Sequence, residues 1–186
     1  MRYCKVASEG KFTDMPIAGI HPNRPKEFRL AIDSLSSNMS IQILDSKSVA
    51  GFEHVMTAAL LTVKSWSEGR NLAHSPSTEV LLYSSAKRQI KEAISSMGVS
   101  EGSEGWVILA LSDSQQKLES FAATLGQYGR DDDELVELTE GKFEGIMEKF
   151  KITEEELQIS EPLVGSKTSA LKSLVMERAA LSELYR

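Results

Sequence analysis

The side chains best placed for chemistry in this sequence are three cations that lie close together in the chain. Lys87 and Lys91 are four positions apart and Arg88 stands three before Lys91, so on a helix all three project from one side. Cations grouped in this way hold phosphates, and such contacts fix a nucleic-acid backbone without reading its bases. The alternative is an exposed amphipathic helix with an Arg88–Glu92 ion pair, which the spacing alone favours.

Further polar groups add to this charge if the fold brings them near. Lys64 and Arg70 lie close to the predicted end of an upstream helix, and Asn71 offers hydrogen-bonding capacity there. The sequence therefore predicts one anion-receiving surface built from residues 64 to 91.

Patterns for catalysis or metal binding are largely missing. Residues 165–168 read Gly-Ser-Lys-Thr but lack the upstream glycine of a phosphate-binding loop, and no predicted strand precedes them. The histidines His21, His54 and His74 lack zinc-ligand spacing, so we interpret them as surface or capping residues. Cys4 is the single cysteine, which excludes an internal disulfide or a cysteine-based zinc cage. We predict no catalytic residue, no metal and no cofactor.

The overall composition is that of an ordinary globular chain. Of 186 residues, 41% are hydrophobic and 26% charged, which argues against disorder and coiled coil. The net charge of −6 is unevenly distributed: residues 1–100 carry 12 Lys and Arg against 9 Asp and Glu, and residues 101–186 carry 9 against 18. A polyanion would use only the basic half, although a solvated surface with an acidic C-terminal region fits equally well.

The hydrophobic pattern also bears on location. The sequence has no apolar stretch of signal-peptide or membrane-spanning length. We expect a cytoplasmic protein without a membrane partner.

Hydrophobic periodicity predicts the elements that position these groups. Strands are predicted at residues 3–7, 39–45, 80–83 and 106–111, and helices at residues 25–36, 48–65, 87–97, 113–125, 143–150, 153–158 and 166–185. Residues 10–25 are predicted as an irregular excursion, and residues 161–162 as a break within a helical C-terminal tail at 141–186. We expect an α+β (mixed α/β) fold in a single domain, 1–186, with a central mixed sheet of four or five strands flanked by helices.

Several segments, in this order and spacing, resemble a known family. Residues 70–73 (RNLA), 79–83 (EVLLY), 87–94 (KRQIKEAI) and 98–99 (GV) resemble the central signature of the KEOPS-complex regulatory subunit family. In animals this family is known as TPRKB, the PRPK-binding protein. Residues 150–157 (FKITEEEL) resemble its acidic turn and residues 177–181 (ERAAL) its last helix, so that the resemblance covers about half of the chain.

The resemblance implies a non-catalytic subunit of the complex that installs threonylcarbamoyl on the adenosine next to the tRNA anticodon. In that family the subunit assembles with the other KEOPS subunits, binds and stimulates a small atypical kinase/ATPase, and grips the single-stranded 3′ acceptor end of tRNA. The implied RNA contacts are Lys87, Arg88, Gln89 and Lys91, with Lys64, Arg70 and Asn71 of lower weight. For Glu79 two other roles stay open, orienting Arg88 or holding a helix end.

The kinase-binding face is predicted on the last helix. That helix carries more apolar surface than packing on a single core requires. We therefore place the partner face at Leu174, Met176 and Ala179. Burial of this surface under other helices of the same chain is the alternative.

A second function also stays open, a small enzyme of unknown class that uses the basic cleft for an anionic metabolite. It would need a titratable group with a perturbed pKa in that cleft. The sequence offers Glu79, Tyr83 and His74 as candidates.

Overall fold

The structure is a computed structural model that describes residues 1–5 and 14–185. Its strands are β1 (Arg2–Lys5), β2 (Asp14–Pro22), β3 (Ser40–Asp45), β4 (Trp106–Leu111) and β5 (Gly129–Asp131). Its helices are α1 (Pro25–Ser36), α2 (Phe52–Ser67), α3 (Pro76–Ser85), α4 (Ile90–Met97), α5 (Gln115–Tyr128), α6 (Glu140–Phe150), α7 (Glu154–Val164) and α8 (Lys167–Leu181), with short 3₁₀ turns η1 (Ser46–Ser48), η2 (Asp133–Leu135) and η3 (Ser182–Tyr185). Parts of the predicted strand at 3–7 and of the predicted excursion at 10–25 lie outside the described residues, as does the side chain of Cys4.

The strands form one sheet in the order β1-β2-β4-β3, with β5 also paired to β2. Ile20 of β2 pairs with Trp106 of β4 on one side and with Asp131 of β5 on the other. The expected α+β fold is confirmed. The expected mixture of parallel and antiparallel strands is wrong for the described strands, because every pairing recorded is antiparallel.

The pairing differs from the prediction because residues 80–83 belong to helix α3 rather than to a strand. Ser75 caps this helix by accepting a hydrogen bond from the Thr78 amide at 3.3 Å, and Pro76 occupies the first turn. Seven of its ten residues are buried. A short apolar run fits a buried helix as well as a buried strand, so the start signal at Ser75 decides between them.

Part of the predicted irregular excursion is a strand, since residues 14–22 form β2 in the sheet. Pro16, Gly19 and Pro22 gave the signal of a loop, whereas Met15 and Ile17 are buried in the core. Gly19 is needed for close packing, because a Cβ atom there would lie 2.2 Å from the carbonyl oxygen of Asp132. Glycine in a strand interior marks such an approach.

Several helix boundaries also differ from the prediction; α2, for example, begins at Phe52 rather than at residue 48. Helix α4 begins at Ile90 rather than at residue 87, because Ala86 ends α3 in the left-handed conformation with φ of 51°. Helix α7 continues through Pro162 and ends before Gly165, whose φ is 89°. A capping box starts this helix: the Thr153 hydroxyl accepts from the Glu156 amide, and the Glu156 carboxylate accepts from the Thr153 amide.

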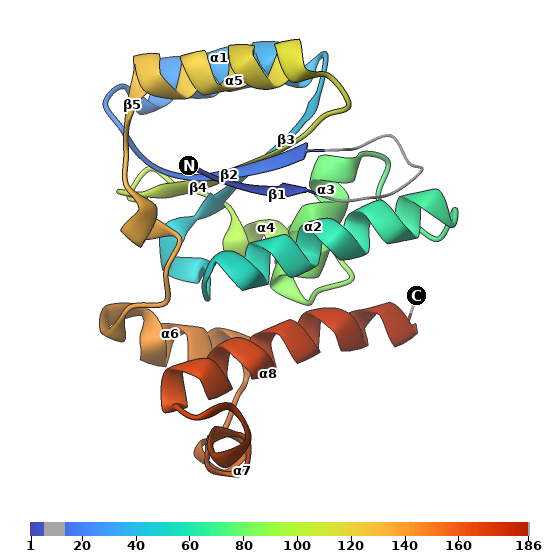
Figure 1. Cartoon of the computed structure of the whole chain (residues 1–186), viewed down its shortest axis with the longest axis vertical. Coiled ribbons are helices and arrows are strands. Elements are labelled where there is room, and N and C mark those ends of the chain that lie inside the picture. Colours follow the sequence, from blue (N-terminus) through green and yellow to red (C-terminus); the bar gives the residue numbers. More distant parts are fainter. Residues whose placement is uncertain (6–13, 186) are drawn as a thin grey trace.

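The helices cover the sheet in layers (Figure 1). Helices α1 and α5 lie over one face, α2, α3 and α4 lie on the opposite side, and α6, α7 and α8 form an outer layer beyond α2. One core cluster includes Phe28, Trp106 and Phe121, and the larger one includes Tyr83 and Leu171. Both faces of β4 are therefore buried, which explains its continuous apolar sequence. Among the described residues, the helices are too short or too polar to cross a membrane.

Candidate nucleic-acid interface

The predicted RNA contacts lie near the two ends of helix α3. Lys87, Arg88 and Gln89 form the turn between α3 and α4, and Lys91 lies in the first turn of α4. The other three contacts, Lys64, Arg70 and Asn71, precede α3 in the chain. Helix α3 has ten residues, so its ends are about 15 Å apart at the usual rise per residue. The structure therefore brings four predicted contacts into one short segment, residues 87–91, which we call the basic turn.

The backbone positions the basic turn, because the left-handed Ala86 reverses the chain and Lys87 donates its amide to the carbonyl of Leu82 at 3.2 Å. Lys87 is half-buried, whereas Arg88 and Lys91 are exposed. Within residues 1–5 and 14–185 the structure records no ion pair for Arg88 or Lys91, so the predicted pairing of Arg88 with Glu92 is absent there. Both cations are therefore available to an external anion.

The amino end of α4 adds to the positive character of the basic turn. Gln89 is the N-cap residue, and its side chain makes no capping hydrogen bond. First-turn amides have no acceptor within the helix, and together they carry the positive end of the helix dipole. Amides in this position bind phosphate oxygens, so the start of α4 can act together with Arg88 and Lys91.

His54 supports the segment that leads into the basic turn. It lies on α2, where its Nδ1 accepts a hydrogen bond from the Ala50 amide at 3.2 Å and its Nε2 donates to the Ser84 carbonyl at 2.8 Å. Its ring also meets the edge of Phe150 at 5.4 Å between centroids. Burial lowers the pKa of His54 to about 4, so the ring is neutral near pH 7. His54 was interpreted as a surface or capping residue. The surface interpretation is wrong, since His54 is buried, but it does donate to a carbonyl in the last turn of α3 and so links α2 to α3.

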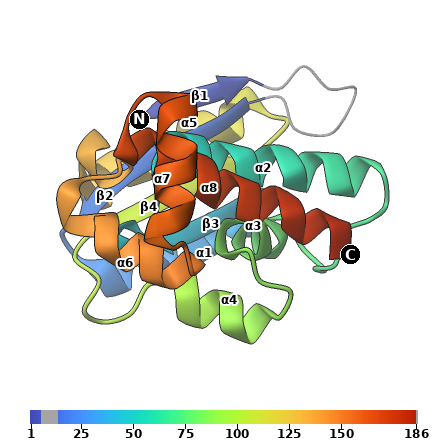
Figure 2. The ribbon, with the colours of Figure 1, turned by 90° about the horizontal axis from the view of Figure 1, so that it is seen from below.

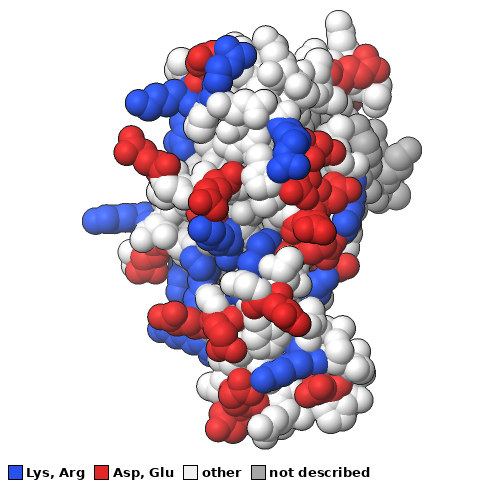
Figure 3. Space-filling model, turned by 90° about the vertical axis from the view of Figure 1, so that its left-hand side faces the viewer, with Lys and Arg blue, Asp and Glu red and all other residues white. Residues whose placement is uncertain are grey.

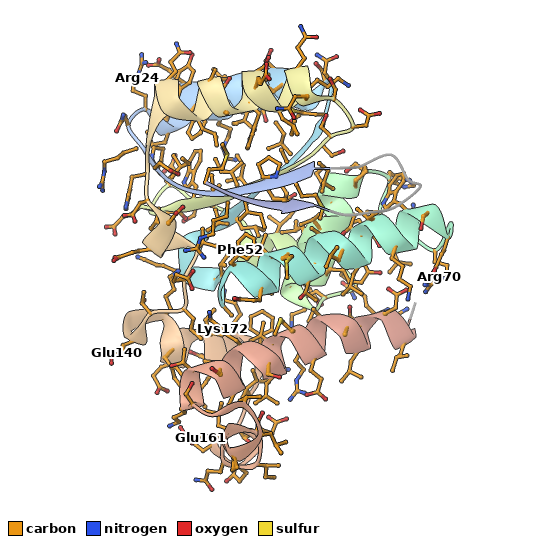
Figure 4. All side chains as sticks on the ribbon, viewed as in Figure 1. Arg24, Phe52, Arg70, Glu140, Glu161 and Lys172 are labelled. Atoms are coloured by element: carbon orange, nitrogen blue, oxygen red, sulfur yellow. The ribbon has the colours of Figure 1, made fainter. Side chains whose placement is uncertain are left out.

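Two of the three predicted contacts before α3, Arg70 and Asn71, are already engaged within the chain, whereas Lys64 is exposed near the end of α2. Arg70 donates to Glu68, with Nε at 2.8 Å, and also pairs with Glu183 of η3. Figure 4 shows Arg70 beyond the end of α2, beside the end of α8. The Asn71 amide nitrogen donates to the Ala73 carbonyl at 3.0 Å. Arg70 is thus neutralised by two carboxylates, and Asn71 shapes its own loop.

The candidates for an enzymatic site also have structural partners. Glu79 is buried and accepts hydrogen bonds from the amides of Leu72 at 3.1 Å and Ala73 at 2.7 Å. It therefore holds the loop before α3. Tyr83 is buried and donates its hydroxyl to a carboxylate of η3, whereas His74 is exposed. The two buried groups are therefore not open to a solvent-borne substrate.

Lys149 of α6 adds a cation near the basic turn that the sequence analysis missed. Its ammonium group donates to the carbonyl of Ser96 at the end of α4. Burial lowers the pKa of Lys149, and the positive charge of Lys87 acts in the same direction. On the side of the molecule formed by α6 and η2, Lys and Arg side chains gather around the middle, bordered by carboxylates (Figure 3). No local sequence signal joins residues so far apart in the chain.

A cavity of about 430 Å³ opens between η1 and α6, lined by His21, Ser46, Lys47, Glu104, Gly105, Leu135, Gly141, Lys142 and Gly145. Lys142 donates to the carbonyls of Leu135 at 2.7 Å and Glu137 at 2.8 Å, and burial lowers its pKa to about 8. His21 faces the Asp132 carboxylate at 3.0 Å. These two groups are committed to acceptors within the protein and are not available to an external anion.

The predicted partner face on α8 needs correction. Leu174 is 8% exposed and Ala179 is fully buried. Both pack within the chain. This agrees with the alternative, in which the apolar surface of the last helix is buried under other helices of the same chain. Met176 alone of the three is partly exposed, so α8 does not present the predicted apolar face.

Comparison with known proteins gives two matches. A family model described as "Kinase binding protein CGI-121" matches residues 23–183. The chain is also similar to the KEOPS complex subunit Cgi121 of Pyrococcus abyssi (strain GE5 / Orsay), with 28% identity over 130 residues that cover 67% of this chain and 70% of the relative. The family match runs from α1 through α8 and includes the whole basic turn.

Proposed function

Because the chain belongs to the CGI-121 family of kinase-binding proteins, we propose that it is a subunit of the KEOPS complex that binds the kinase of that complex. The family match over residues 23–183 carries this proposal. The similarity to a KEOPS complex subunit supports the assignment to the complex. In this proposal the chain stimulates the kinase/ATPase without catalysing a reaction of its own, and so takes part in threonylcarbamoyladenosine modification of tRNA.

The proposal includes binding of the 3′ acceptor end of tRNA by the basic turn. Arg88 and Lys91 contact phosphates, and Lys87 and Gln89 add charge and hydrogen bonds beside them. The support for this is the exposure of Arg88 and Lys91, their lack of recorded ion pairs in the described chain, and the uncapped start of α4. Arg70 and Asn71 contribute less, because Arg70 is paired with Glu68 and Glu183 and Asn71 donates to the Ala73 carbonyl. Lys64 is exposed but lies on α2, before the basic turn in the chain.

The direct test mixes the purified chain with the KEOPS kinase subunit from the same organism. We expect a stoichiometric complex by calorimetry and a higher ATPase rate of the kinase when the chain is present. The chain alone should show no ATPase activity above buffer. An absence of binding, or ATP hydrolysis by the chain alone, would contradict the proposed function.

A further inference from the structure

Helix α7 carries apolar side chains that are exposed to solvent and do not pack within the chain. Leu157 is the one buried residue among the eleven of this helix. Ile159 is 73% exposed, Leu163 82% and Val164 40%. Ile159 and Leu163 are four positions apart and therefore share one face of the helix. Packing within the chain thus does not account for these three side chains, and grouped exposed apolar residues mark interaction sites.

Helix α7 carries two carboxylates whose negative charge is not neutralised within the described chain. Glu155 and Glu161 are exposed, and the described residues include no ion-pair partner for either. Two other carboxylates of α7 are neutralised, since Glu154 pairs with Lys167 and Glu156 pairs with Arg178. The exposed apolar patch of α7 therefore has an acidic border.

The other exposed large apolar side chains of the described residues are Leu30, Leu60, Leu72, Ile90, Ile94, Leu181 and Leu184. Leu181 and Leu184 lie on either side of Glu183 in the chain, and Glu183 pairs with Arg70. Ile90 and Ile94 on α4 adjoin Arg88 and Lys91 of the basic turn. Leu30 on α1 stands at the opposite end of the molecule. Seen from below, α7 faces the viewer, whereas α4 lies at the edge of the view (Figure 2). The acidic patch on α7 and the basic turn are thus separate surfaces with opposite charge.

We propose that Ile159, Leu163 and Val164 of α7 dock into an apolar groove on the kinase, and that Glu155 and Glu161 meet Lys or Arg side chains on the border of that groove. This rests on the proposed function, since it names the surface through which the kinase is bound. Apolar residues four apart on one helix face are the usual anchors of a helix in a groove. A second copy of this chain fits poorly, because two α7 helices in contact would bring like charges together. Figure 4 shows Glu161 on α7 at the end of the molecule away from Arg24, where a large partner has access.

The test measures binding of the full chain to the KEOPS kinase subunit of the same organism by calorimetry. The double variant Ile159→Asp/Leu163→Asp should bind at least about 30-fold more weakly, as loss of central interface anchors does. The matched control is Leu30→Asp on α1, where the side chain is 70% exposed. This control should bind as the wild type does. Both variants should keep the far-UV circular dichroism spectrum and the tRNA affinity of the wild type.

A second variant tests the charges without adding polar groups to the apolar patch. Glu155→Lys/Glu161→Lys should weaken kinase binding and reverse its salt dependence, so that added salt strengthens the complex. Wild-type affinity in both double variants would overturn the α7 surface and leave the proposed function standing. If these variants lose self-association while kinase binding is unchanged, the α7 surface binds a second copy of this chain rather than the kinase, and the inference is overturned. A wild-type chain that fails to bind the kinase would overturn both proposals.

Discussion

At the scale of single residues, RNA binding in this account depends on Arg88 and Lys91. Both are exposed, and neither has an ion pair among the described residues, whereas Arg70 is held by Glu68 and Glu183. The identity of these cations could be predicted from their spacing. Their unequal availability could not, because Glu183 lies 113 residues from Arg70 in the chain.

The first prediction concerns the tRNA affinity of the double variant Arg88→Glu/Lys91→Glu. Binding should weaken roughly 10- to 100-fold at low salt, since two phosphate contacts become repulsive. The slope of log K against log salt should fall by roughly 1.4, at about 0.7 for each contact with a single strand. Filter binding or fluorescence anisotropy at several salt concentrations measures both quantities.

The matched control is Lys26→Glu/Arg130→Glu, which makes the same change of charge at two exposed residues on α1 and β5. Its affinity and salt slope should fall far less. Equal losses in the two double variants would mean that net charge, rather than the basic turn, governs binding. Equal affinity of the wild type for tRNA with and without its 3′ tail would argue against recognition of the acceptor end.

The second prediction concerns stability against acid and follows from His54. Its pKa is about 4 in the folded chain and 6.5 in the reference state, so the unfolded chain takes up the proton first as the pH falls. Stability is therefore lost between about pH 6.5 and pH 4, by about 2 kcal/mol at pH 5. The free energy of unfolding of His54→Gln should change less over this window than that of the wild type. Parallel pH profiles in the two proteins would refute the role of His54, and the exposed His74→Gln serves as the control.

At the scale of elements, the turn between α3 and α4 determines where the cations point. The pattern predicted one continuous helix from residue 87, but Ala86 adopts a left-handed conformation and places Lys87, Arg88 and Gln89 before α4. Helix α5 and strand β3 could be predicted because their periodicity has one interpretation. Strand β4 was also predicted, although its continuous apolar run is as ambiguous as that of α3. Helix α3 and strand β2 could not, because a fully buried apolar run and a strand containing proline give misleading local signals.

The third prediction tests the strain in this turn. Ala86 has φ of 51°, a conformation that costs a residue with a Cβ atom about 1 kcal/mol and glycine almost nothing. After the larger entropy loss of glycine, Ala86→Gly should stabilise the chain by roughly 0.5 kcal/mol and raise Tm by about 1 to 2 °C. Thermal unfolding followed by circular dichroism measures the change. A lower Tm would show that the Ala86 side chain contributes packing that outweighs its backbone strain.

At the scale of the whole molecule, the uneven charge of the sequence corresponds to two surfaces. The basic turn belongs to the half of the chain with excess Lys and Arg, and the acidic patch on α7 belongs to the half with excess Asp and Glu. The difference in charge between the two halves could be read from the sequence. The partner face, however, was predicted on α8, where Leu174 and Ala179 are buried. Because the outer layer of α6, α7 and α8 is fixed by contacts between residues far apart in the chain, its exposed face could be found only from the structure.

Binding of kinase and tRNA at the same time tests this account most directly. Sedimentation velocity of the full chain with the KEOPS kinase subunit and intact tRNA from the same organism should show one species that contains all three. The tRNA affinity should be the same within about twofold at saturating kinase, since independent sites do not compete. Displacement of the kinase by tRNA, or of tRNA by the kinase, would contradict two separate surfaces on one chain.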